Sequence, residues 1–260
     1  MLAAAKQTSW SDHMFQASSE RARNAGSHRS PTMNQYYSNR DILQDIGNLL
    51  RRRKITGIVD AGAFIGQKTL VLAGLFPDAK IFSFEPNPGT FCKLKLRYAA
   101  NPNVVCIQAA LGSQTSRREF FLNKVPQASS LLRRPVTGKR YYQADSTHEG
   151  RIEVDSWTLD QWITENARSL RIELLKLDVQ GSELEVLQGA SVTLKNDLLL
   201  VWTEIEFVEL YENAANYLEV ASFMKEFGFD LFQLYDLVMA DDGQLVYGDA
   251  LFIKHSDLHS

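Results

Sequence analysis

The chain has 260 residues, of which 45% are hydrophobic and 23% are charged, and its formal net charge is −3. A chain of this length and apolar content buries a substantial core, which favours one main domain. The small negative charge gives no general attraction for nucleic acid or for an anionic membrane, and we expect neither as a partner.

Residues 1–39 are rich in Ser, Asn, Gln and Arg and predict a flexible extension, which either orders as a lid over a ligand or only docks loosely. Their scattered charges stand where a signal peptide would need an apolar stretch, and the chain has no run of about 18 apolar residues. Cys92 and Cys106 are isolated, so the sequence favours neither a disulfide framework nor a structural zinc site. We therefore expect a cytoplasmic protein.

Residues 40–260 are expected to form one α/β domain, because apolar runs alternate with helical patterns along them. Helices are predicted at about 41–50, 66–75, 88–100, 158–168, 183–193 and 216–227, and strands at about 57–61, 80–85, 103–109, 172–178, 198–205, 230–235 and 249–254. This alternation predicts a mostly parallel sheet with helices on both faces, whereas the hairpin signal Asp242–Gly243 predicts an antiparallel last strand pair. Residues 112–150 break the alternation, as either a substrate-selecting segment or a variable loop.

The first predicted strand runs into a glycine turn, "VDAGAFIG" at 59–66, in the usual ligand cradle of a parallel α/β sheet. Gly62 and Gly66 do not fit the P-loop spacing, and Asp60 would repel a phosphate. The dinucleotide pattern G-x-G-x-x-G survives only in part, because position 60 is Asp and position 63 is Ala. An aspartate complements the positively charged amino group and sulfonium of S-adenosylmethionine, so this cofactor fits the turn best.

The second predicted strand ends at Glu85, in "FSFEPNP", and Pro86 stops the strand there. An acid at this strand end can accept hydrogen bonds from the ribose hydroxyls of a bound nucleoside. It would serve NAD as well as S-adenosylmethionine, and it also has an ordinary interpretation as a solvated acid before a helix. Glu85 therefore favours adenosine without choosing the cofactor.

Carboxylates at the ends of the fourth and fifth predicted strands are candidates for the chemistry. Asp178, in "LLKLDVQGSELEVLQGA" at 174–190, is expected to project into the ligand crevice as a general base or as the group that orients the acceptor. Glu204 and Glu206, in "VWTEIEF" at the end of the fifth predicted strand, are secondary candidates, although either can simply line a polar rim. His148 is a further candidate base, although a loop histidine is more often simply exposed.

These motifs, in this order and together with "IEVDSWTLD" at 152–160 and the closing "DALFIK", resemble the FkbM family of S-adenosylmethionine-dependent methyltransferases over about residues 40–254. The resemblance implies a Rossmann-like class I methyltransferase domain with seven strands, and methyl transfer to an oxygen, commonly a sugar or polyketide hydroxyl. Catalysis is assigned to Asp178 and Glu204. The residues assigned to the cofactor are Asp60, Gly62, Ala63, Phe64, Gly66, Glu85, Pro86, Ala110 and Asp178.

The sequence departs from the family pattern at Gln180, where the family usually has an acid in D-x-E-G-x-E. If that acid orients Asp178 or the acceptor, its loss affects the catalytic assignment. Two alternatives therefore stay open: a catalytically silent nucleoside-binding protein, and, with less support, an NAD-dependent oxidoreductase. The strand-end motifs contain no cluster of metal ligands, and the expected partner is a small-molecule acceptor.

Overall fold

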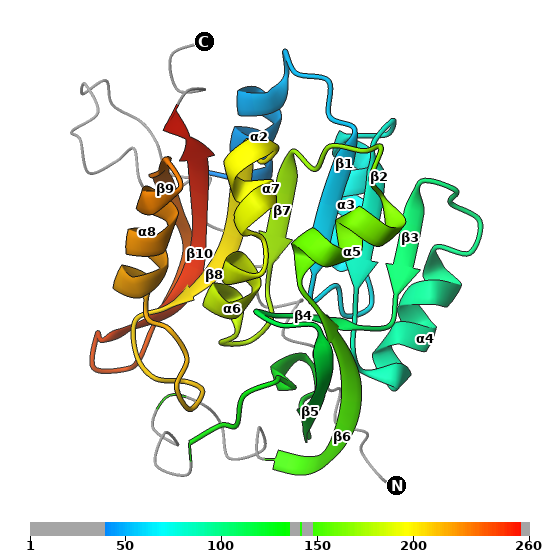
Figure 1. Cartoon of the computed structure of the whole chain (residues 1–260). Coiled ribbons are helices and arrows are strands. Elements are labelled where there is room, and N and C mark those ends of the chain that lie inside the picture. Colours follow the sequence, from blue (N-terminus) through cyan, green and yellow to red (C-terminus); the bar gives the residue numbers. More distant parts are fainter. Residues whose placement is uncertain (1–39, 136–140, 142–147, 256–260) are drawn as a thin grey trace, which may run out of the picture. The chain divides into compact units, whose positions relative to one another are not determined.

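The computed structural model describes residues 40–135, 141 and 148–255, and its centre is a seven-stranded β-sheet (Figure 1). The strands follow the order β3–β2–β1–β7–β8–β10–β9. They are β1 (Gly57–Ala61), β2 (Lys80–Phe84), β3 (Val104–Ile107), β7 (Leu174–Leu177), β8 (Leu200–Glu206), β9 (Phe229–Met239) and β10 (Leu245–Lys254). Neighbouring strands are parallel, except that β10 runs antiparallel to β8 and β9, which confirms the predicted sheet.

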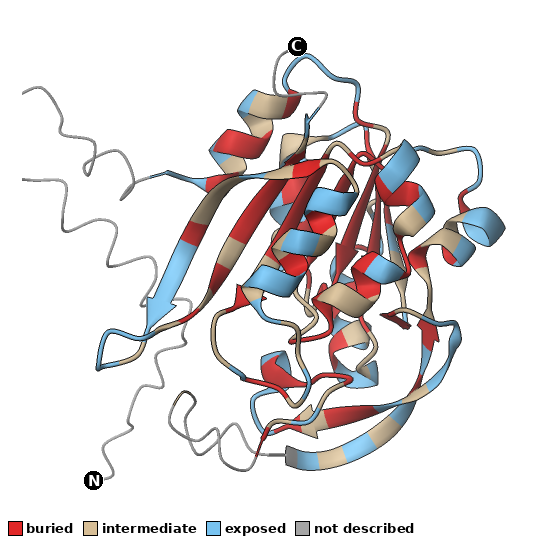
Figure 2. Ribbon diagram, turned by 60° about the vertical axis from the view of Figure 1, so that its left-hand side comes forward, coloured by how far each residue is buried: buried red, intermediate tan, exposed pale blue. Residues whose placement is uncertain are grey.

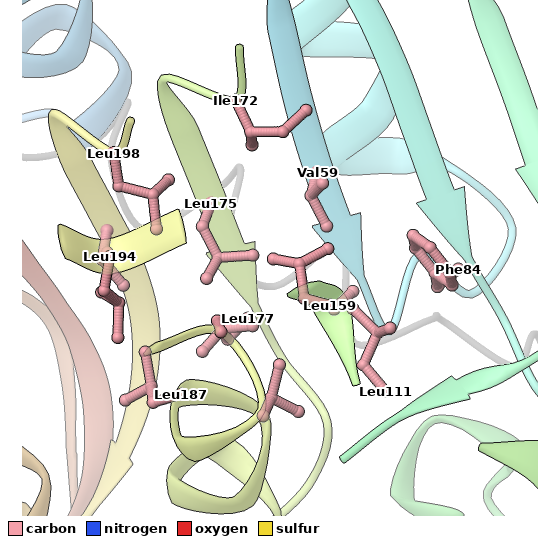
Figure 3. Close-up of a cluster of buried hydrophobic side chains, with 14 of the residues drawn as sticks. Val59, Phe84, Leu111, Leu159, Ile172, Leu175, Leu177, Leu187, Leu194 and Leu198 are labelled. Carbon is pink, nitrogen blue, oxygen red and sulfur yellow. The ribbon is translucent and has the colours of Figure 1, made fainter. Parts of the chain in front are cut away.

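Helices cover both faces of this sheet, and each face has its own hydrophobic core. One face packs against α2 (Ile42–Leu50), α3 (Gln67–Leu75) and α4 (Pro88–Arg97), and the other against α5 (Leu159–Asn166), α6 (Glu183–Gln188), α7 (Ser191–Asn196) and α8 (Tyr217–Glu226). Successive strand residues point to opposite cores, as Ile58 and Val59 do in β1. Figure 3 shows the second core, where Leu175 and Leu177 of β7 share one cluster with Leu187 of α6.

The last two strands are longer than predicted, and they meet at the predicted Asp242–Gly243 turn. Gly243 adopts a φ of +84°, a conformation that glycine reaches without steric cost. The backbone N–H of Gln244 donates to Oδ1 of Asp242 at 3.1 Å, which closes the turn locally. The predicted hairpin is confirmed.

The prediction of one helix at 183–193 was wrong in one respect, because the segment forms two short helices, α6 and α7. Gly189 lies at the break, and a Cβ at this position would stand 2.1 Å from the carbonyl oxygen of Gly112. α7 starts afresh beyond it, since the Asp160 carboxylate of α5 accepts a hydrogen bond from the backbone N–H of Thr193 at 2.9 Å. Contacts with residues distant in sequence therefore end one helix and start the next.

A second, three-stranded sheet was not predicted from the sequence, and one of its strands, Ser116–Asn123, lies within the excursion at 112–150. It has the order β4–β6–β5 and consists of β4 (Ala110–Leu111), β5 (Ser116–Asn123) and β6 (His148–Trp157). Exposed ion pairs join β5 and β6, among them Arg117 with Glu153 and Arg151 with Glu119. Charged side chains fill the solvent-facing positions of these strands, which left only a weak apolar signal in the sequence.

The small sheet lies beyond the carboxyl ends of the parallel strands, at the edge where a sheet of this kind binds its ligand (Figure 1). Two contacts join this region to the segment that follows β7. Ser130 Oγ donates to the carbonyl oxygen of Gln180 at 2.6 Å, and Arg118 forms an ion pair with Glu185 of α6. Figure 2 shows the central strands mostly buried, whereas the second half of β9 is exposed and β6 alternates between exposed and more buried positions.

Residues 1–39 lie outside the described residues, so their role as an extension or a lid stays a prediction. Within the described ranges, none of the helices is long and apolar enough to cross a membrane.

Candidate active site

Glu85 follows β2 and contacts the glycine turn that follows β1. Its carboxylate accepts hydrogen bonds from the backbone N–H groups of Phe64 (2.9 Å) and Asn87 (2.9 Å) and from the hydroxyl of Thr90 (2.7 Å). Burial raises the pKa of Glu85, while these hydrogen bonds act in the opposite direction. Two residues assigned to the cofactor, Phe64 and Glu85, are thus in direct contact, and Pro86 follows them in a half-buried position.

Asp60 is fully buried, and its carboxylate is held by partners within the chain. Thr69 of α3 donates to its Oδ2 at 2.6 Å, and Nζ of Lys176 lies 3.1 Å from its Oδ1. The same ammonium lies 3.5 Å from Oδ2 of Asp178, so Lys176 links two predicted site residues. Burial lowers the pKa of Lys176, but the two carboxylates outweigh burial and raise it, so the side chain is a cation. A contact between Asp60 and the cofactor stays a prediction.

Lys176 was not among the predicted site residues, although the sequence carries a signal for it. A lysine inside the apolar run "LLKLD" is only 2% exposed as a residue, and a buried charge requires an opposite charge nearby. Its partner across the parallel pairing of β1 and β7 is Asp60, which stands directly opposite in register.

The two glycines of the turn have structural reasons of their own. A Cβ on Gly62, whose φ is +71°, would stand 1.8 Å from the carbonyl oxygen of Asp178. A Cβ on Gly66, whose φ is +85°, would stand 2.5 Å from the ring of Tyr98. Ala63, between them, is buried in the core beneath α3 and α4. Their packing explains why both positions are glycine, and their contact with the cofactor stays a prediction.

Asp178 and Glu204 are brought together by one side chain. The amide nitrogen Nε2 of Gln180 donates to Oδ1 of Asp178 at 2.8 Å and to Oε2 of Glu204 at 2.9 Å. The side chain of Asp178 is 39% exposed, so its carboxylate is open to solvent at the end of β7. The pair of carboxylates proposed for catalysis therefore forms a joined unit at the carboxyl ends of β7 and β8.

Three further residues support this unit, and the sequence carried no local signal for them. The hydroxyl of Tyr211 lies 2.7 Å from Oε1 of Gln180, and it accepts a hydrogen bond from Nη2 of Arg134 at 3.0 Å. Ser130 holds the carbonyl oxygen of Gln180. All three come from segments far from residue 180 in sequence, and only the fold brings them there.

The surroundings of this unit are rich in carboxylates. Burial raises the pKa of Glu204 well above its usual range, and the charges of Asp178, Glu183 and Asp249 raise it further. Burial is also the first cause for Glu183 and Glu206, raising their pKa values to about 7 and about 8, and for Asp249, raising it to about 6. Burial at this end of the sheet therefore shifts these acids toward the neutral form.

Two other predicted residues lie elsewhere. Ala110 belongs to β4 and is buried in a small core with Phe120, Leu131 and Val154. The backbone of His148 begins β6 and pairs with Asn123. A functional role for either residue stays a prediction.

The strand order, with one antiparallel strand inserted near the edge of a parallel sheet, and the polar groups gathered at the carboxyl ends of its strands define a Rossmann-like class I methyltransferase. The Methyltransferase FkbM domain matches residues 60–231, so the chain belongs to the FkbM methyltransferase family.

Relatives of known name are also methyltransferases. The chain is 31% identical over 195 residues to Methyltransferase sdnD of Sordaria araneosa, covering 67% of this chain and 73% of that protein. It is 29% identical over 161 residues to 2-O-methyltransferase NoeI of Sinorhizobium fredii, covering 60% and 65% of the two chains. For Hexuronic acid methyltransferase AglP of Haloferax volcanii the identity is 27% over 137 residues, covering 53% and 51%. The crystal structure of Methyltransferase FkbM from Methylobacillus flagellatus has a TM-score of 0.49 at 16% identity, covering 77% of this chain and 44% of that one.

Family membership makes this protein a methyltransferase with S-adenosylmethionine as its cofactor. It also decides against the NAD-dependent oxidoreductase that Glu85 had left open. The family does not by itself say which atom receives the methyl group.

Proposed function

We propose that the protein transfers a methyl group from S-adenosylmethionine to a hydroxyl oxygen of a small polar molecule, such as a sugar or a hydroxylated natural product. The observation that carries this proposal is the joined pair of carboxylates, in which Asp178 is open to solvent and Glu204 is held next to it by Gln180. A hydroxyl acceptor loses a proton as it is methylated, and this pair supplies a base and a hydrogen-bonding group at one place. The names of NoeI and AglP support an acceptor of this class.

The polar groups of the first two strand ends fit the cofactor. A carboxylate offers about four acceptor positions, and the chain fills three of those on Glu85 with the donors described above. Glu85 therefore keeps capacity for a ribose hydroxyl. The open carboxylate of Asp178 and the turn at Gly62 lie at the adjacent strand end, and we assign the methionine portion to them.

When bound, S-adenosylmethionine supplies a methyl group that is already activated by its positively charged sulfur. The task of the protein is then to hold the acceptor oxygen in line and to take up its proton as the oxygen gains the methyl group. We assign the proton to Asp178, because this carboxylate is exposed. Glu204 has a raised pKa, and we assign it a hydrogen bond to the acceptor.

The test is methyl transfer from labelled S-adenosylmethionine to a panel of neutral hexosides, amino sugars, uronates and simple hydroxylated compounds, with the methylated atom located by mass spectrometry and NMR. We expect a product methylated on oxygen, and a loss of kcat on the order of 10²- to 10⁴-fold in Asp178→Asn at saturating cofactor. Asp78→Asn, at an exposed position before β2, is the matched control. Methylation on nitrogen or carbon, or full activity of Asp178→Asn, would contradict the proposal.

The acceptor panel, together with a binding measurement, also tests the alternative of a catalytically silent protein that Gln180 left open. Calorimetric titration with S-adenosylmethionine and S-adenosylhomocysteine, without acceptor, measures binding alone. Tight binding of both ligands with no transfer to any member of the panel would favour the silent protein.

A further inference from the structure

Gln180 adopts an unusual backbone conformation for a residue with a side chain. Its φ is +60°, in the left-handed region, and Gly181 follows with a φ of +94°. Residues other than glycine rarely adopt such angles, and they persist where the surrounding structure holds them in place. Here the hydroxyl of Ser130 donates a hydrogen bond to the carbonyl oxygen of Gln180. Tyr211 packs so closely against Gly181 that a Cβ added to this glycine would lie 3.0 Å from Cβ of Tyr211. The turn thus directs the Gln180 side chain toward the strand ends.

The orientation of the Gln180 amide follows from its partners. The NH₂ group has two protons, and it faces one carboxyl oxygen of Asp178 and one of Glu204, both of which can accept a hydrogen bond. The hydroxyl of Tyr211 has one proton to donate, and Oε1 of Gln180 at 2.7 Å is a nearer acceptor than the carbonyl oxygen of Ala128 at 3.1 Å. Both ends of the amide are therefore satisfied in a single arrangement.

Charged groups surround this arrangement from every neighbouring element. Lys176 of β7 lies beside Asp178, while Glu183 of α6, Glu206 of β8 and Asp249 of β10 add negative charge around Glu204. The positive charge of Lys68 of α3 lowers the pKa of Asp249, and that of Arg134 lowers the pKa of Glu206, in both cases against the effect of burial. A neutral side chain that donates to two carboxylates at once relieves their repulsion without adding a further charge.

We infer that Gln180 is a positioning residue, which fixes the direction of the Asp178 carboxylate and keeps Asp178 and Glu204 paired and available for proton transfer. Tyr211 and Ser130 lock Gln180 in this role from outside the strand-end motifs. The role of Gln180 in proton transfer rests on the proposed function, whereas its effect on the geometry and titration of the two carboxyl groups does not.

The kinetic test compares Gln180→Met and Gln180→Glu with the wild-type enzyme. Gln180→Met keeps the length of the side chain but removes both donors, and we expect kcat to fall roughly ten- to hundredfold while KM for S-adenosylmethionine changes less than about twofold. Gln180→Glu can donate only when protonated, so its activity relative to wild type should fall as the pH rises. Gln161→Met is the matched control, because Gln161 makes a similar amide–carboxylate bond to Glu165 on the exposed side of α5.

A second measurement needs no acceptor and no turnover. Carboxyl ¹³C NMR of protein labelled on Asp and Glu, with Asp178→Asn and Glu204→Gln used to assign the signals, gives the titration midpoints of the pair. We expect the midpoint of Glu204 to rise further in Gln180→Met, because its charged form loses a hydrogen-bond donor. The control Gln161→Met should leave it unchanged.

The two measurements separate the two possible failures. A raised Glu204 midpoint in a protein that methylates no acceptor would support the placement of Gln180 and overturn the proposed function. An unchanged Glu204 midpoint, or a Gln180→Met enzyme that loses only thermal stability and keeps its kcat and pH profile, would overturn the role of Gln180.

Discussion

The carboxylates at one end of this sheet differ in burial and in how many hydrogen bonds they can still accept from a ligand. Asp60 is committed to Lys176 and Thr69, and it is fully buried. Glu85 is buried as well, but its three donors leave acceptor capacity. Asp178 is open to solvent. Asp60 is therefore closed off from solvent by its burial, whereas Asp178 is open to a ligand.

At this scale we predict that Glu85→Gln weakens the binding of S-adenosylmethionine. A charged acceptor is lost, and each hydrogen bond to a charged group contributes roughly 1.5 to 3 kcal/mol, which corresponds to about a ten- to hundredfold rise in Kd. Isothermal titration calorimetry with the cofactor and with S-adenosylhomocysteine measures the change. Glu226→Gln, at an exposed position of α8, is the control. An unchanged Kd in Glu85→Gln would move the adenosine away from this strand end.

Between elements, one ion pair joins the two central strands. Asp60 of β1 and Lys176 of β7 face each other in the parallel register, and both are buried. Asp178 adds a second carboxylate to the same ammonium. A buried pair of this kind adds little net stability compared with an apolar pair, but removal of one partner leaves a charge without compensation.

We predict that Lys176→Met destabilises the protein by about 3 to 5 kcal/mol, because Asp60 is then buried without its cation. The double variant Asp60→Asn with Lys176→Met should recover a large part of this loss, since it removes both charges. Urea unfolding measures the free energies, and Lys93→Met on the exposed face of α4 serves as the control. Equal stability of Lys176→Met and the double variant would contradict this prediction, because removal of the Asp60 charge would then recover nothing.

Across the whole molecule, the acids with raised pKa values gather at one end of the large sheet. Glu183 and Glu206 have pKa values raised to about 7 and about 8, and Asp249 to about 6, in each case mainly by burial. The folded protein therefore binds protons that the unfolded chain releases at lower pH. Their contribution to stability is complete below the unfolded pKa values and is lost as the pH rises through the folded ones.

We therefore predict that the Tm falls between about pH 4.5 and pH 8 through these groups. Glu206→Gln should make this fall shallower, because a neutral amide does not ionise. Differential scanning fluorimetry across this range, with Glu226→Gln as the exposed control, measures both slopes. A Glu206→Gln slope as steep as that of wild type would contradict the role assigned to Glu206.

The sequence predicted most of the large sheet, because apolar periodicity is a local property. The strand predicted at 57–61 has the bounds of β1, and the antiparallel last pair was predicted from the Asp242–Gly243 turn. The small sheet was missed, because its charged outward positions hide the strand pattern. The break at Gly189 was missed because its cause is the approach of Gly112, which is far away in sequence.

The sequence by itself determined the order of the motifs, and with it the family and the cofactor. Only the tertiary structure decided that Asp60 is paired with Lys176 and that Gln180 joins Asp178 to Glu204. The physical reason is distance along the chain. Helical and strand periods, turns and glycine spacings arise from neighbouring residues, whereas a buried ion pair or a shared amide depends on how the sheet brings separate strand ends together.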